Sequence, residues 1–75
     1  MNSKETLRDM REYLNIGAFI TKTQLARYLQ IGRHGGGEIE KYLEGISYMP
    51  NGRGKSYFAA DVAKRIVELS VRREI

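Results

Sequence analysis

The sequence predicts a mostly α-helical domain that carries one small β-hairpin and is organised around two short, adjacent helices. Apolar residues recur at helical spacing in three stretches, and the middle stretch opens with a helix cap and contains a glycine run. An Asn51-Gly52 pair, among the strongest short hairpin signals, lies between the second and the third of these stretches. We therefore expect an N-terminal packing helix (1–18), a helix-turn-helix (21–44), a two-stranded hairpin (46–58) and a C-terminal helix (61–73).

Length and composition limit the classes of protein to consider. With 75 residues the chain forms one domain at most (1–75), and a chain of this size buries only about 60% of its unfolded surface. It has no cysteine and one histidine, so we expect no disulfide, no metal site and no cofactor. No run approaches the ~18 apolar residues of a membrane span, and no signal pattern opens the chain. We expect a soluble, cytoplasmic protein without a membrane partner.

Charge favours an anionic partner. The formal net charge is +4 and the sequence pI is about 9.6, a balance typical of proteins that bind polyanions. The charges of residues 1–20 balance, whereas residues 46–58 carry Arg53 and Lys55 and no acid. The least compensated charge therefore lies in the predicted hairpin.

The N-terminal helix is expected to run from Lys4 to Asn15, with Ser3 as its cap and Gly17 as its stop. Its apolar residues form one stripe at i, i+3 and i+7, which indicates a helix that closes the core. A surface for a partner is the alternative. The stripe consists of Leu7, Met10 and Leu14.

The first helix of the helix-turn-helix is expected over residues 22–30. Thr21 and Gln24 fit a capping box, in which each side chain satisfies a backbone N–H of the first turn. Ile31-Gly32 is expected to end the helix, because glycine adopts the left-handed conformation without a Cβ penalty. Thr23 and Arg27 fall on the outward side, where Arg27 could reach a phosphate. A solvated helix charge is the alternative for Arg27.

The second helix of the motif has its apolar side at Ile39 and Leu43. Two small helices joined by a tight turn form a helix-turn-helix, which lays the exposed face of its second helix in the DNA major groove. The candidate contact residues on that face and at its N-terminal end are Arg33, His34, Gly37 and Lys41.

The glycine run and three acids weigh against a simple groove-filling helix. Each glycine costs about 0.8–1 kcal/mol in a helix relative to alanine, so we favour a helix that begins late, near Gly37 or Glu38, over glycines that allow close approach of the backbone to DNA. Glu38, Glu40 and Glu44 would repel phosphates unless they point along the groove or towards solvent.

The hairpin is expected to carry its cations near its tip and its aromatic residues on its arms. Because a two-stranded hairpin is marginal in water, we expect the aromatics to anchor it to the helices. These aromatics are Tyr48, Tyr57 and Phe58. Arg53 and Lys55 then remain free for nucleic acid, and Asp61 is expected to cap the last helix.

Two blocks resemble the excisionase-like members of the MerR-related winged-helix group. The first consists of residues 20–29 and 31–33, and the second of residues 52–58 and 61–66. The resemblance implies a winged helix-turn-helix fold, with the second motif helix in the major groove and the hairpin wing on the adjacent minor groove or backbone. It implies recognition-helix roles for Arg33, His34, Gly37 and Lys41, and wing roles for Arg53 and Lys55. The chain departs from the group at Gly35-Gly36-Gly37, where an ordinary helix is usual.

The leading hypothesis is a sequence-preferring, double-stranded DNA-binding protein. The resemblance adds two possible roles, a recombination directionality factor that acts beside a recombinase or a small transcription regulator; copies could bind cooperatively or as dimers. The alternative is a protein-interaction adaptor that keeps the fold without binding DNA. An enzyme is not expected, since no nucleophile and base form a recognisable set.

Overall fold

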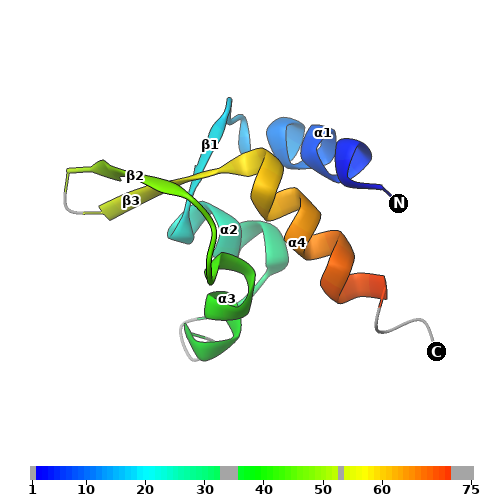
Figure 1. The fold of residues 1–75 in the computed structure, drawn as a ribbon. Helices are drawn as coiled ribbons and strands as arrows, with labels where there is room; N and C mark the ends of the chain where they lie inside the picture. The colour runs from blue at the N-terminus through cyan, green and yellow to red at the C-terminus, as the bar shows by residue number, and fades with distance from the viewer. Residues whose placement is uncertain (1, 33–35, 53, 72–75) are drawn as a thin grey trace.

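Helices dominate the fold, and a small antiparallel sheet extends from one side of them (Figure 1). The structure is a computed structural model that describes residues 2–32, 36–52 and 54–71, with the backbone alone at Ser70 and Val71. The elements follow one another as α1 (Ser3–Leu14), β1 (Phe19–Thr21), α2 (Lys22–Leu29), α3 (Gly36–Leu43), β2 (Tyr48–Asn51), β3 (Gly54–Phe58) and α4 (Ala59–Val71).

The sheet has three strands in the order β1-β3-β2, one more than the predicted hairpin. The additional strand is the segment between the first two helices, where Phe19 pairs with Phe58 and Ile20 with Tyr57. A three-residue strand is too short to show an alternating pattern, which is why the sequence does not distinguish it from a loop. By pairing with β3, β1 connects the hairpin directly to the start of α2.

The predicted hairpin is present, with its turn one residue later than Asn51-Gly52 would place it. Asn51 pairs with Gly54, so Asn51 is the last residue of β2 and not a residue of the turn. Gly52 has a φ of +62°, in the left-handed region that glycine adopts without strain. The side-chain amide of Asn51 donates to Ser56 Oγ at 3.0 Å, a hydrogen bond that links β2 to β3. Arg53 lies outside the described residues.

The aromatic side chains of the hairpin do not all anchor it to the helices, so that prediction was wrong in part. Tyr57 shares a sheet face with buried Ile20 and packs against the core. Tyr48 leans on Tyr57 at a ring separation of 5.7 Å and stays half exposed, while Phe58 stacks at 5.0 Å on Phe19. The pleat explains why Phe58 differs from Tyr57, because neighbouring residues of β3 point to opposite faces. Tyr48 lies opposite Tyr57 on the same face, but it stands on the edge strand β2 and stays half exposed.

Both ends of α1 differ from the prediction. Asn2, not Ser3, is the N-cap, and it forms a capping box in which Glu5 N–H donates to Asn2 Oδ1 at 2.9 Å. The helix ends at Leu14 because Asn15, with φ +54°, is its left-handed C-cap, two residues before Gly17. Asparagine tolerates this conformation better than most residues.

The Thr21–Gln24 capping box is confirmed. Gln24 N–H donates to Thr21 Oγ1 at 3.2 Å, and Thr21 N–H donates to Gln24 Oε1 at 2.9 Å. The end of α2 was predicted wrongly, because Gln30, with φ +57°, terminates the helix ahead of Gly32. Six residues, 30–35, separate α2 from α3, whereas the turn of a typical helix-turn-helix has three or four.

The last helix begins at Ala59, directly after β3, and not behind a cap at Asp61. The N–H of Ala59 donates to the carbonyl of Ala18 at 2.9 Å, which ties the start of α4 to the segment before β1. Asp61 lies in the first turn, where its negative charge suits the helix dipole. Residues 72 and 73 of the predicted helix lie outside the described residues.

The core lies among the four helices, and Ile20 of β1 adds to it. Every helix contributes at least one fully or almost fully buried apolar side chain, as the predicted stripes require. Among the described residues no buried side-chain nitrogen or oxygen lacks a hydrogen-bond partner. The buried apolar residues are Met10, Ile20, Leu25, Ile39, Leu43, Ala59, Val62 and Ala63.

Candidate nucleic-acid interface

An ion pair joins the two helices of the motif across their exposed sides. Lys22 Nζ lies 2.8 Å from Glu40 Oε1, and both side chains are more than half exposed. The hydrogen bond and the charge of Glu40 raise the pKa of Lys22, and the same contact lowers the pKa of Glu40. At neutral pH both groups are therefore charged, and the carboxylate of Glu40 is compensated by a cation of its own chain.

The β2–β3 hairpin carries a second cation, Lys55, whose charge acts on the carboxylate of Glu40. Lys55 stands on β3, and its charge also lowers the pKa of Glu40, after the larger effects of Lys22. Lys55 Nζ lies 4.5 Å from the centroid of the Tyr48 ring, in the geometry of a cation–π contact. Lys22 at the start of α2 and Glu40 in the middle of α3 thus form an ion pair, and the charge of Lys55, near the tip of the hairpin, acts on the same carboxylate. We call Lys22, Glu40 and Lys55 the junction.

The outward side of α2 is as the sequence predicts. Thr23 and Arg27 are exposed, one helical turn apart, whereas Leu25 between them is fully buried. Within the described part of the chain, the side chains of Thr23 and Arg27 make no hydrogen bond or ion pair. Thr23 directly follows Lys22 of the junction, and Arg27 lies near the other end of the helix.

On α3, Gly37 and Lys41 are both exposed and lie one turn apart. The helix includes Gly36 and Gly37, so it begins one residue earlier than the late start favoured. A Cβ placed on Gly37 would meet no atom within 4 Å. Gly37 therefore presents helix backbone without a side chain of its own and with open space around it. Arg33 and His34 lie outside the described residues.

A side chain of α4 forms a hydrogen bond with the last turn of α3. Arg65 Nη1 donates to the backbone carbonyl of Lys41 at 2.8 Å, and Arg65 Nε lies 3.7 Å from Glu68 Oε1. A cation on a carbonyl at the C-terminal end of a helix is favourable for the helix dipole. This contact fixes the orientation of α3 against the rest of the fold and leaves the Lys41 side chain exposed.

The acids of α3 divide into one compensated and two uncompensated groups. Glu40 has Lys22 and Lys55 beside it, while Glu38 and Glu44 are exposed and form no ion pair among the residues described. The sequence identified the acids but not Lys22 as the partner of one of them. The two residues are 18 positions apart, and no local pattern connects residues at such a distance.

Other kinds of site find little support in the described ranges. Residues 2–32, 36–52 and 54–71 contain no group of three His, Cys, Asp or Glu side chains that could hold a metal ion. The helices within those ranges are all too short or too polar to cross a bilayer. Protein-family models gave no match to the chain, and neither did comparisons with curated proteins and with solved structures.

Proposed function

We propose that this chain is a winged helix-turn-helix protein that binds double-stranded DNA with a sequence preference. In this proposal α3 enters the major groove and the β2–β3 hairpin lies on the adjacent minor groove or backbone. The observation that carries it is the junction, where Lys22 of α2 pairs with Glu40 of α3 and the charge of Lys55 on the hairpin acts on the same carboxylate.

The roles of individual residues follow from their exposure. Thr23 and Arg27 are proposed to contact the phosphates that flank the groove, because short polar and cationic side chains on the first motif helix face outward. Lys41 and the open backbone at Gly37 are proposed to face the groove itself. Arg33 and His34 are proposed for the entry to α3 and Arg53 for the tip of the wing, on the grounds of sequence alone.

The junction also weakens the main objection to DNA binding. An unpaired carboxylate on the groove face would repel phosphate, but Glu40 is neutralised by Lys22 and Lys55. Glu38 and Glu44 keep their charge, and they favour the second candidate function, a protein-interaction adaptor without DNA binding. Recombination directionality beside a recombinase, or transcription regulation, in the cytoplasm, remains the proposed cellular role of the DNA-binding form.

A salt titration of binding to short duplex DNA tests the proposal. About 4–6 phosphate contacts would give a slope of log affinity against log salt of about −4 to −5. The double variant Arg53→Ala/Lys55→Ala should bind every sequence more weakly and make the slope shallower by about 2, one for each lost phosphate contact. The matched control Lys4→Ala/Lys64→Ala removes the same charge from α1 and α4. An unchanged slope in the wing variant, or an equal change in the control, would refute the wing assignment.

Chemical-shift mapping with the same duplexes separates DNA binding from the adaptor function. DNA binding predicts shifts at the amides of Arg27, Lys41 and Lys55 at low salt, together with smaller changes in the core. Absence of shifts at all three positions would favour the adaptor. A duplex of unrelated sequence, run in parallel, reports how much of the affinity depends on sequence.

A further inference from the structure

The charged side chains of α1 are sorted by sign around the helix. At 100° per residue, Lys4, Arg8 and Arg11 fall within about 60° of one another. Glu5, Asp9 and Glu12 fall on the neighbouring strip, centred about 100° away. Although the segment has no net charge, one side of the helix therefore carries a cationic stripe. Its residues Lys4, Arg8 and Arg11 are all exposed.

Two of the three acidic side chains accept hydrogen bonds from other residues of the fold. Glu5 Oε1 accepts the backbone N–H of Asn2 at 3.3 Å as part of the capping box. The carboxylate of Asp9 accepts from the hydroxyl of Tyr28 on α2 at 2.5 Å. These acids therefore contribute to the cap and to the α1–α2 contact, whereas among the described residues Lys4 and Arg8 form no ion pair.

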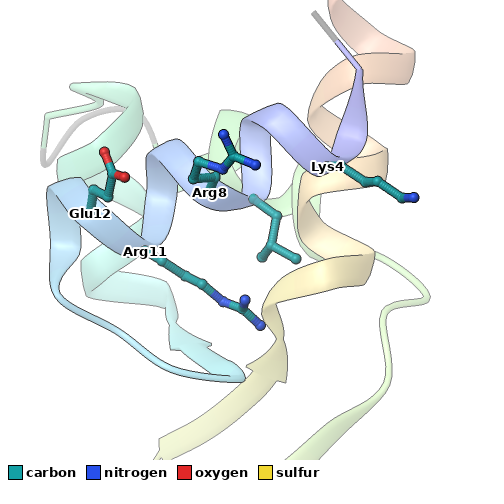
Figure 2. Close-up of a pocket in the computed structure, with 5 residues that line it drawn as sticks. Lys4, Arg8, Arg11 and Glu12 are labelled. Carbon is teal, nitrogen blue, oxygen red and sulfur yellow. The ribbon is translucent and has the colours of Figure 1, made fainter.

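The cationic stripe borders a shallow hollow of about 310 Å³ (Figure 2). Leu7 lies between the cations and packs with its inner side against the core. Figure 2 shows the side chains of Lys4 and Arg11 both extending towards the right of the view, with Glu12 near the end of the helix from which Arg11 arises. We call this site, lined by Lys4, Leu7, Arg8, Arg11 and Glu12, the α1 hollow.

One wall of the α1 hollow is held in place. Arg11 Nε donates to the carbonyl of Gly17 at 3.3 Å, so the guanidinium is fixed near the loop that leads to β1. A pre-oriented arginine loses less side-chain freedom on binding a carboxylate and can still offer its terminal nitrogens. The hollow thus combines a positioned cation, two further cations and an apolar floor.

The α1 hollow belongs to a different part of the molecule from the junction. α1 packs chiefly on α4, and α3 packs on another part of α4, so that Figure 1 shows α1 at the top and α3 at the bottom. A duplex bound along α3 and the wing would leave α1 facing away from it.

We propose that the α1 hollow binds an acidic helical segment of a protein partner, with an apolar side chain of that segment seated on Leu7. Lys4, Arg8 and Arg11 repeat at i, i+4 and i+7, a span of about 10 Å along the helix, which matches carboxylates on successive turns of a second helix. The apolar floor and the carboxylate of Glu12 fit a peptide better than a phosphate backbone, which carries charge without apolar groups. This surface is additional to DNA binding and does not depend on it.

Synthetic peptides of about 15–20 residues, long enough to form a helix in part, provide the test on the full chain. The first peptide carries glutamates on three successive turns and a central leucine; the second replaces the glutamates by glutamine, and the third replaces the leucine by serine. We expect the first peptide to shift the amide signals of Leu7, Arg8 and Arg11, and the other two to bind at least about tenfold more weakly. Equal binding by the glutamine or the serine peptide would overturn the proposal.

Two charge-reversal variants complete the test. Lys4→Glu/Arg8→Glu should bind the first peptide at least tenfold more weakly while keeping the melting temperature and the DNA affinity within a small factor, since both side chains are exposed. The matched control Lys41→Glu/Lys55→Glu makes the same charge change on the proposed DNA face and should keep the peptide affinity. Unchanged peptide binding by the α1 variant would overturn the proposal, and so would duplex DNA that shifts the α1 amides as strongly as the peptide does.

Discussion

Lys22 Nζ lies 2.8 Å from Glu40 Oε1, so a single ion pair connects the first turn of α2 with the middle of α3. Both partners are exposed, and such pairs add little to stability because water screens them. The contact matters more for the surface that it creates. It places a neutralised carboxylate, and not a free one, on the side of α3 that we propose to face DNA.

Glu40→Gln is therefore expected to strengthen DNA binding. The change removes a negative charge from the proposed interface and releases Lys22 to pair with a phosphate, so we expect an affinity gain of several-fold at low salt and about one additional unit of salt slope. Fluorescence anisotropy with a labelled duplex measures it. Glu12→Gln on α1 is the control, with the same charge change outside the interface. If the two variants behaved alike, only net charge would be involved.

Gly37→Ala is expected to have opposite effects on the stability of the free protein and on its affinity for DNA. In the free protein the new methyl group meets no atom within 4 Å, and alanine is the better helix former, so the free energy of unfolding should rise by up to about 1 kcal/mol. If the backbone of α3 approaches DNA at this point, the same variant should bind duplex DNA more weakly. Denaturant unfolding and anisotropy are measured on one sample.

Gly17→Ala is the matched control for this variant, because its Cβ also has open space and it lies outside the helices. It should leave DNA affinity unchanged. A Gly37→Ala protein that is more stable and binds DNA as well as the wild type would contradict the close approach, without contradicting DNA binding.

Tyr28 should make the stability depend on pH in the alkaline range. Burial raises its pKa to about 12, with the hydrogen bond to Asp9 and the charge of that carboxylate acting in the same direction. Because the folded pKa exceeds the ordinary value of 10.0, this contribution to stability is complete below pH 10 and is lost as the pH rises towards 12. Tyr28→Phe should flatten the fall in stability over that range.

Tyrosinate absorbance of the folded protein measures the titration directly, as the difference between the wild type and Tyr28→Phe. Asp9→Asn removes the charge and weakens the hydrogen bond but not the burial, so it should lower the pKa of Tyr28 only in part. A return to the ordinary value in Asp9→Asn would show that burial is not the larger cause.

Leu25→Ala should be among the most damaging single substitutions. Leu25 is fully buried at the centre of the core, and such truncations cost about 2–5 kcal/mol. A domain of this length has about 4–11 kcal/mol in total, so a large part of its stability would be lost. Met49→Ala, at a side chain that is half exposed on β2, should cost far less. Urea unfolding of both variants makes the comparison, and equal losses would contradict the assigned core.

The sequence determined the elements that depend on local spacing. The capping box of Thr21 and Gln24 starts α2, and the i, i+4 pair of Ile39 and Leu43 buries one side of α3. Likewise the exposure of Arg27 and Lys41 follows from the helical period. These features were predictable because each involves residues within one or two turns of the same helix.

The tertiary structure alone decided the contacts between distant residues. The pairing of Ile20 with Tyr57 makes β1 a strand, and the ion pair of the junction joins Lys22 and Glu40, which are 18 positions apart in the sequence. On α1, the carboxylate of Asp9 accepts a hydrogen bond from Tyr28, which lies 19 positions away in the sequence. In each case the partner is selected by packing, which brings together groups that no sequence period relates.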